Sequence, residues 1–214
     1  MSSRGLFLTL EGIEGAGKST VARFIGAWLA REGIPARLTR EPGGTPLAER
    51  VREVVLERGS EPLSAVTETL LMFAARSLHV QNLIRPALAR GEWVVCDRFT
   101  DATRAYQGCG RAVDAALIES LAHAVHQGLV PDLTVLLDVP VALGLARARA
   151  RAGAGADRFE AETVEFFEKV RAGYLSLAAR EPQRFTVIDA AAPLAQVERR
   201  IGERLLELRS RSRA

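Results

Sequence analysis

A glycine-rich segment near the start of the chain has the residue types and spacing of a phosphate-binding loop. It follows a short apolar run and fits the pattern G-x-x-x-x-G-K-[ST]. In this pattern, glycines let backbone N–H groups converge on phosphate oxygens, and the next helix directs its positive end at the same anion. Lys18 is predicted to bridge the β- and γ-phosphates in catalysis, and the Ser19 hydroxyl to bind Mg²⁺. The predicted ATP-binding residues are Gly12, Ile13, Glu14, Gly15, Ala16, Gly17, Lys18, Ser19 and Thr20. The alternative, a turn with a solvated lysine, is disfavoured by the strand and amphipathic helix on either side.

A second pair of charged residues ends a later apolar run, Val94-Val95-Cys96-Asp97-Arg98. In open α/β sheets, ligands collect at the carboxyl ends of the strands, so both side chains are expected to face the phosphate-binding loop. Asp97 is predicted to hold a Mg²⁺-bound water or to orient the acceptor, and Arg98 to clamp the acceptor phosphate during catalysis. An exposed Asp-Arg pair at a strand end is the other interpretation.

The phosphate-binding loop alone identifies a nucleotide binder and leaves the reaction open. A GTPase needs an Asn/Thr-Lys-x-Asp segment to read guanine, and Lys18 and Lys169, the only lysines, do not form one. A small-molecule kinase and a regulatory ATPase that acts on nucleic acid therefore remain. The modest net charge of +3 argues against a large nucleic-acid footprint, so no nucleic-acid partner is expected.

Five short apolar runs separated by amphipathic stretches indicate how these residues are positioned. The runs read as buried strands and lie at 6–10, 36–39, 93–96, 133–137 and 185–188. Helical periodicity appears around 21–29, 47–57, 65–89, 113–127, 141–151, 161–179 and 194–208. Strands that alternate with helices predict an α/β fold with a five-stranded parallel sheet that is doubly wound.

The size and composition fit one ordinary globular domain, residues 1–214, with 48% hydrophobic and 26% charged residues. No apolar run approaches the ~18 residues of a membrane span, and the N-terminal residues do not resemble a signal peptide. A cytoplasmic protein with no membrane partner is therefore expected. Cys96 and Cys109 lack metal-ligand spacing and are predicted to be free thiols.

Four segments in order along the chain resemble bacterial thymidylate kinases, which are P-loop nucleoside monophosphate kinases. These segments are Glu-Gly-Ile-Glu-Gly-Ala-Gly-Lys-Ser-Thr at 11–20, Arg-Glu-Pro-Gly-Gly-Thr at 40–45, Leu-Met-Phe-Ala-Ala-Arg at 71–76, and Asp97-Arg98-Phe99 through Ala105-Tyr106-Gln107-Gly108. The resemblance implies a homodimeric enzyme of dTTP biosynthesis, which moves the γ-phosphoryl group of ATP to dTMP with Mg²⁺. Another nucleoside monophosphate, or a deoxynucleoside, is the alternative acceptor.

The resemblance also implies which residues bind the acceptor. Phe73 would stack on the thymine ring, with ordinary core packing as the alternative, and Arg76 would hydrogen-bond a base carbonyl. Thr103, Tyr106 and Gln107 would line the nucleoside pocket, although Thr103 and Gln107 fit a polar helix surface equally well. Arg40 would help to hold the acceptor phosphate or be a solvated charge, and Glu14 would lie near the sugar.

An Arg-rich stretch at about 146–160 is similar to the short lid of these kinases. Arg149 and Arg151 are predicted to act in catalysis and Arg147 to bind ATP, because a lid arginine that arrives on closure stabilises the transferring phosphoryl group. Positions 147 and 151 share a helix face that 149 does not, so the three cannot all serve one phosphate. The alternative is a basic helix face that keeps the protein soluble or binds nucleic acid nonspecifically. Asp157 and Glu160 match lid carboxylates that reach the acceptor.

Overall fold

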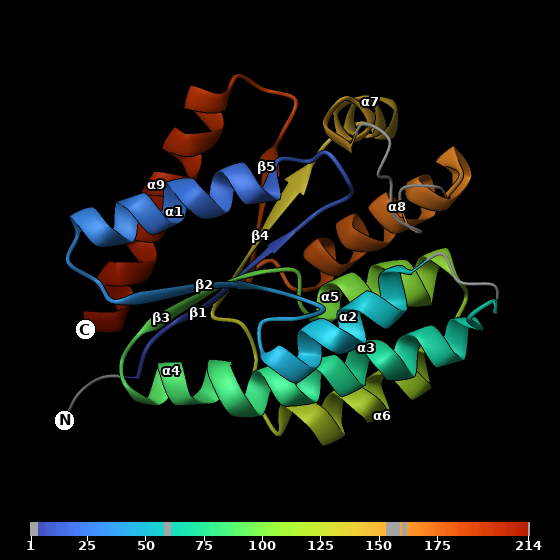
Figure 1. The fold of residues 1–214 in the computed structure, drawn as a ribbon. Helices are drawn as coiled ribbons and strands as arrows, with labels where there is room; N and C mark the ends of the chain where they lie inside the picture. The colour runs from blue at the N-terminus through green and yellow to red at the C-terminus, as the bar shows by residue number, and fades with distance from the viewer. Residues whose placement is uncertain (1–3, 58–60, 153–158, 160–161, 214) are drawn as a thin grey trace.

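A parallel sheet of five strands runs through the middle of the structure (Figure 1). The computed structural model describes residues 4–57, 61–152, 159 and 162–213. The strands are β1 (Phe7–Glu11), β2 (Ala36–Arg40), β3 (Trp93–Asp97), β4 (Leu133–Asp138) and β5 (Phe185–Asp189), and their order in the sheet is β2-β3-β1-β4-β5. The predicted α/β fold with a five-stranded parallel sheet is confirmed.

Helices cover both faces of this sheet. The α-helices are α1 (Lys18–Arg31), α2 (Pro46–Leu56), α3 (Ala65–His79), α4 (Arg85–Ala89), α5 (Thr100–Thr103), α6 (Ala115–His126), α7 (Val141–Ala152), α8 (Val164–Arg180) and α9 (Leu194–Arg213). Two π-helical segments are η1 (Val80–Ile84) and η2 (Arg104–Gly110). In Figure 1, α1 and α9 lie on one side of the sheet, while α3, α4 and α6 lie on the other. Among the described residues, no helix is both long and apolar enough to cross a membrane.

The central position of β1 determines where the phosphate-binding loop lies. All five β1 residues are buried, since β1 pairs with β3 on one side and β4 on the other. The register places Leu10 beside Asp97 and Arg40 beside the same Asp97, so the ends of β1, β2 and β3 meet at one edge of the sheet. The loops after these three strands therefore form the walls of one site.

The segment between β3 and α6 is the part of the fold that the periodicity did not predict. It forms α5 and η2, and the apolar side chains that its sequence TDATRAYQGCG buries are only two alanines and a tyrosine. Polar side chains are buried beside them, because Thr100, Asp101, Thr103 and Gln107 are each at most 3% exposed. The amphipathic pattern is weak in a helix whose inward face is largely polar and hydrogen-bonded.

Candidate active site

A cavity of about 200 Å³ opens at the carboxyl edge of the sheet. Its walls come from the phosphate-binding loop, the end of β2 and the loop after it, helices α2, α3 and α5, the end of β3 and the loop after it, η2, and Phe159. Its lining residues include Glu14, Gly15, Gly17, Lys18, Ser19, Arg40, Arg76, Asp97, Arg98, Thr103, Tyr106 and Gln107. The structure therefore brings together most of the site residues that the sequence predicted.

The phosphate-binding loop is held tightly against the rest of the fold. Gly15 has a φ of +71°, and a Cβ atom there would lie 1.9 Å from the carbonyl oxygen of Gly144 in α7, so only glycine fits. Lys18 is buried, and its Nζ donates to the carbonyl oxygens of Gly12 and Ile13 at 3.1 and 3.0 Å. Burial, assisted by the nearby charge of Arg98, lowers the pKa of Lys18 to about 8. The amine is thus placed for an anion that would restore its charge.

Arg98 is the most densely bonded cation in the cavity. Its guanidinium donates to Glu14 Oε1 at 2.7 Å, to the Tyr106 hydroxyl at 3.0 Å and to the Gly12 carbonyl oxygen at 3.2 Å. It also lies 4.6 Å from the centre of the Tyr106 ring. Its backbone φ of +71° is in the left-handed region that a residue with a side chain adopts only under constraint. The sequence gives no sign of this backbone conformation.

Glu14 and Tyr106 complete a charge-balanced cluster with Arg98. The Tyr106 hydroxyl donates to Glu14 Oε2 at 2.5 Å, and Arg98 holds the other carboxylate oxygen. Burial raises the pKa of Tyr106 well above its usual value, so the phenol stays protonated and remains a donor. A carboxylate beside bound phosphates would be repelled by their negative charge. Arg98 and the Tyr106 hydroxyl offset the charge of Glu14 and so make its position tolerable.

Arg76 forms the far wall of the cavity from α3. Its Nε donates to Glu41 Oε2 at 2.6 Å, and both side chains are at most 3% exposed. Its Nη2 donates to the Thr103 hydroxyl at 3.1 Å. Its Nη1 is buried and has no hydrogen-bond partner in the part of the chain that the structure describes. A buried guanidinium N–H without a partner is costly, so this donor fits a ligand oxygen.

Phe73 does not lie where it was predicted to lie. Its side chain is 2% exposed and packs in a separate apolar cluster with Val113, Ile118 and Ala122, behind Arg76, whose Cζ lies 4.7 Å from the centre of the Phe73 ring. Met72 lines the cavity in its place. Both residues lie one helical turn before Arg76, but Met72 is on the side that faces the cavity and Phe73 on the side that faces α6. In this structure Phe73 therefore has the core position of the alternative, and its stacking on the thymine ring stays a prediction.

Thr103 and Gln107 are both 2% exposed and line the cavity. The Gln107 amide donates to Glu68 Oε1 at 2.7 Å, which fixes the side chain from the opposite helix. The alternative in which these two residues lie on a solvated helix surface is thereby wrong.

Arg40, Ser19 and Asp97 lie where the cavity opens toward a second, shallower groove, and they line both. The Arg40 side chain is 56% exposed and pairs with Glu49 at 2.9 Å. Arg40 is therefore a solvated charge in this structure, at the mouth of the cavity.

The predicted lid residues are only partly described. Arg147 on α7 donates from Nη1 to the carbonyl oxygen of Ala190 at 2.8 Å, which ties α7 to the loop after β5. Arg149 is exposed on the same helix. The side chain of Arg151, together with Asp157 and Glu160, lies outside the described residues.

Several cavity residues were missed by the sequence reading. Arg52 on α2 donates to the carbonyl oxygen of Pro42, and Phe159 packs edge-on against Tyr106 with 6.0 Å between ring centres. Met72 carried a usable signal, since it lies one turn before Arg76, but the family resemblance implied its neighbour Phe73. Arg52 and Phe159 carried no signal that distinguishes them from surface charge and ordinary core.

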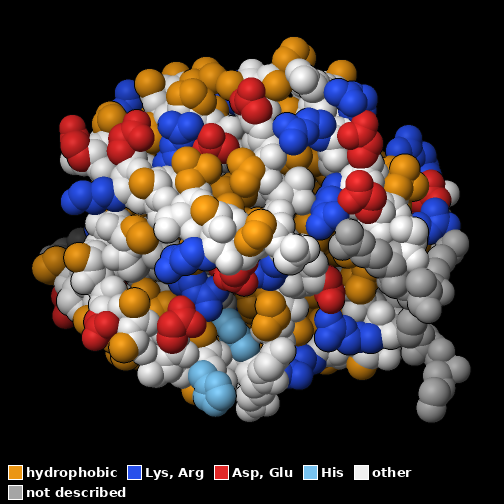
Figure 2. Space-filling model, turned by 180° about the vertical axis from the view of Figure 1, so that it is seen from behind, with side chains coloured by type: hydrophobic (Ala, Val, Ile, Leu, Met, Phe, Trp, Pro, Cys, Tyr) orange, Lys and Arg blue, Asp and Glu red, His pale blue; other side chains and the backbone are white. Residues whose placement is uncertain are grey.

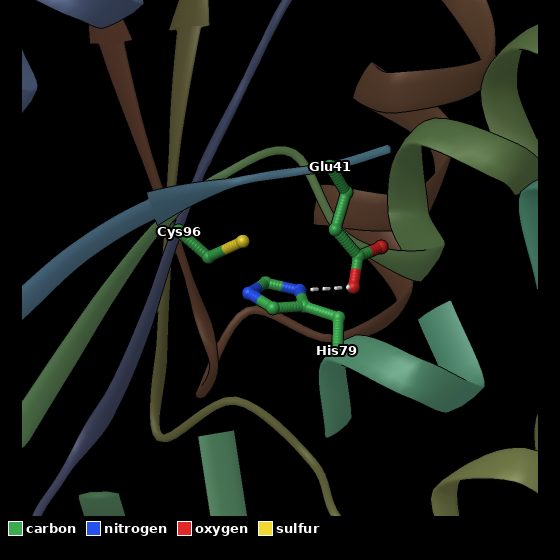
Figure 3. Close-up of side chains that lie close together, drawn as sticks. All are labelled: Glu41, His79 and Cys96. Atoms are coloured by element: carbon green, nitrogen blue, oxygen red, sulfur yellow. Dashed lines mark hydrogen bonds and ion pairs between the residues drawn. The ribbon is translucent and has the colours of Figure 1, made fainter. Parts of the chain in front are cut away.

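Glu41, His79 and Cys96 point toward one another from the end of β2, from α3 and from β3 (Figure 3), and their ligand-type atoms lie within 4.8 Å. Each already has a partner. Glu41 bonds Arg76 and the Nδ1 of His79, and the other ring nitrogen of His79 is 2.8 Å from the Thr39 hydroxyl. The Cys96 thiol donates to a main-chain carbonyl oxygen, and burial raises its pKa, so the thiolate that a metal needs is disfavoured. The cluster is thus a hydrogen-bonded core, and we assign it no metal.

Comparisons with known proteins agree along almost the whole chain. The sequence model of the family described as "Thymidylate kinase" matches residues 10–201. The chain is 54% identical over 209 residues to a thymidylate kinase from Pseudomonas fluorescens (strain SBW25), which covers 98% of this chain and 99% of that protein. The chain belongs to the thymidylate kinase family. A thymidylate kinase from Teredinibacter turnerae is 55% identical over 203 residues, covering 95% and 98% of the two chains.

A solved structure gives the same result for the fold. The crystal structure of a thymidylate kinase from Ehrlichia chaffeensis aligns with a TM-score of 0.71 and 34% identity, and it covers 86% of this chain and 93% of that one. Family membership confirms the resemblance drawn from the four sequence motifs and the predicted P-loop kinase fold. It also confirms the predicted activity, phosphoryl transfer to dTMP in dTTP biosynthesis.

Proposed function

We propose that this chain transfers the γ-phosphoryl group of ATP to dTMP, giving ADP and dTDP. One end of the cavity would bind the phosphates, and the other end would bind the base of the acceptor. One observation carries the proposal. A single cavity joins a phosphate-binding loop with a buried lysine at one end to a buried arginine with an unsatisfied donor at the other. Such a cavity holds the phosphates of two substrates close together and a base further away.

The phosphate end acts by positioning and charge. Lys18 would contact the β- and γ-phosphates, and Arg98, which donates to the same Gly12 carbonyl oxygen as Lys18, would contact the acceptor phosphate. No general base is required, because a phosphate monoester has a second pKa of about 6 and is already ionised as a nucleophile near neutral pH. Arg149 and Arg151 would approach the transferring group from the lid at about 146–160, and Arg147 would contact ATP beside the loop after β5.

The acceptor end selects the nucleotide. The free Nη1 of Arg76 would donate to a base carbonyl, and Met72 would lie against the base one helical turn away. Thr103 and Gln107 would complete the base pocket, and Tyr106 and Glu14 would face the sugar. Phe73 is not part of this proposal.

Further acceptor contacts rest on the family resemblance. Arg40, at the mouth of the cavity, would turn from Glu49 to the acceptor phosphate. Asp157 and Glu160 would reach the same ligand from the lid.

The donor set fits Mg²⁺. Ser19 and Asp97 both line the cavity beside Lys18 and offer a hydroxyl and a carboxylate, which are oxygen donors of the kind that Mg²⁺ prefers. The ion would neutralise charge on the ATP phosphates. Ser19 would bind it directly and Asp97 through water.

The chain is proposed to act as a single-domain homodimer in the cytoplasm, without nucleic-acid or membrane partners. Leu47 and Val54 on α2, and Val66 and Leu70 on α3, are each about half exposed, and these two helices pack together. A second copy of the chain would cover them. On the face in Figure 2, Lys and Arg side chains are interspersed with Asp and Glu among the described residues, which is unlike a nucleic-acid footprint.

A coupled assay of ADP release with ATP and Mg²⁺ tests the acceptor assignment. The panel is dTMP, dUMP, dCMP, dAMP, dGMP, UMP and thymidine, with Lys18→Ala as the matched inactive control. The proposal predicts a strong preference for dTMP. A wild-type enzyme that leaves dTMP unreacted and uses another acceptor would show that the assigned base pocket is wrong.

A further inference from the structure

Two buried side chains that the proposed mechanism does not use lie beneath Arg98. Glu11, the last residue of β1, is 0% exposed, and Tyr174 on α8 is 1% exposed. The Tyr174 hydroxyl donates to Glu11 Oε2 at 2.8 Å. A buried carboxyl group is costly unless its oxygens are hydrogen-bonded. The hydrogen-bond partners of Glu11 therefore indicate which part of the site it holds in place.

Both residues also hold Arg98, one through its backbone and the other through its side chain. Glu11 Oε1 accepts from the backbone N–H of Phe99 at 2.8 Å, which fixes the peptide that follows the positive-φ residue. The Tyr174 hydroxyl accepts from Arg98 Nη1 at 3.2 Å. A strained backbone of this kind persists only when its surroundings over-determine it. Glu11 and Tyr174 supply that constraint.

The charges around Glu11 affect whether its carboxyl group is protonated while it holds Arg98. Burial, and then the charge of Asp101, raise the pKa of Glu11 to about 8, while Arg98 and the hydrogen bonds to Tyr174 and Phe99 lower it. Lys18 also faces this group. Glu11 therefore binds a proton more tightly than a free glutamate does, and glutamine keeps the shape and an acceptor oxygen of the neutral form.

We propose that Glu11 and Tyr174 are positioning residues that hold the Arg98 guanidinium where it meets the acceptor phosphate. They do not contact the acceptor themselves. The inference rests on the proposed function, because it takes Arg98 as the acceptor-phosphate ligand. Loss of Glu11 or Tyr174 should therefore weaken binding of the acceptor phosphate and leave binding of the base and sugar unchanged.

Binding of dTMP and of thymidine, which lacks the phosphate, separates positioning from general stability. Tyr174→Phe removes only the hydroxyl group. It should weaken dTMP binding about tenfold in calorimetry, the effect of one hydrogen bond, and change thymidine binding less than about twofold. KM for ATP should not change. The matched control is Thr9→Val, which removes a buried hydroxyl bonded to Thr134 at 2.8 Å on the same strand as Glu11. It should leave both affinities unchanged.

Glu11 is tested with a conservative and a disruptive variant. Glu11→Gln keeps an acceptor for the Phe99 N–H and a polar contact with Tyr174, so it should retain the preference for dTMP over thymidine at pH 7. Glu11→Leu should lose that preference as Tyr174→Phe does. If Glu11→Leu does not fold, the Tyr174→Phe comparison still decides.

Equal loss of dTMP and thymidine binding in Tyr174→Phe, or no loss of either, would overturn the positioning role. The proposed function fails in a different way, when the wild type prefers another monophosphate. The same comparison is then made with that monophosphate and its nucleoside.

Discussion

Met72 and Phe73 are adjacent on α3 and are predicted to affect different properties when truncated. Met72 lines the cavity, whereas Phe73 is 2% exposed in the cluster with Val113, Ile118 and Ala122. Met72→Ala removes the part of the side chain that would lie against the base, a loss of about 1–2 kcal/mol. KM for dTMP should therefore rise about 5–30-fold. KM for ATP should stay constant, because the phosphate-binding loop is untouched.

Phe73→Ala should instead destabilise the fold. Truncation of a buried phenylalanine costs about 3–5 kcal/mol, which for a chain of this size lowers Tm by roughly 6–20 °C. Phe73→Leu keeps most of the apolar volume, so it yields folded enzyme for kinetics, and its KM for dTMP should lie within about twofold of the wild type.

Steady-state kinetics with dTMP and with ATP, together with thermal unfolding, measure both effects on the same preparations. The reasoning is refuted if Phe73→Leu raises KM for dTMP while Met72→Ala leaves it unchanged. That result would place the aromatic ring at the base, as the sequence suggested.

Three further predictions follow from the buried charges. Arg76→Ala leaves Glu41 buried without its main partner, so it should lower the free energy of unfolding in urea by about 3–5 kcal/mol. The double variant with Glu41→Ala should lose less than the sum of the two single variants. Additive losses would contradict the pairing. Because burial lowers the pKa of Lys18 to about 8 and ATP favours the charged amine, ATP binding at pH 8 should take up protons. Calorimetry in two buffers of different ionisation enthalpy measures this, and identical heats would refute it. The pKa of Glu11 is raised from 4.5 to about 8, so the folded state binds the extra proton, and unfolding free energy should fall as pH rises from about 4.5 and level off above about 8. Glu11→Gln should flatten this profile, and parallel profiles would count against it.

The sheet and the phosphate site were predictable because their signals are local. Buried parallel strands appear as continuous apolar runs, and the spacing of Gly12, Gly17, Lys18 and Ser19 follows from the shape of a polyphosphate. The order of the strands in the sheet does not follow from such runs, because pairing partners are distant in sequence.

The acceptor end was less predictable because its arrangement depends on tertiary contacts. Arg76 was found, but its pairing with Glu41 joins residues 35 positions apart. Tyr174 reaches Glu11 across 163 positions, and no local pattern marks it. The family resemblance implied Phe73, but in the structure Met72 lines the cavity and Phe73 is buried in the core.

The most direct test of the account follows the phosphorus atoms themselves. ³¹P NMR of purified protein with ATP, Mg²⁺ and dTMP records ATP, ADP, dTDP and inorganic phosphate in one sample. The account predicts that dTDP and ADP appear in equal amounts while inorganic phosphate stays at background, and that no ATP is consumed without an acceptor. Release of inorganic phosphate with ADP and no dTDP would contradict it, because the cavity would then activate water instead of the acceptor phosphate.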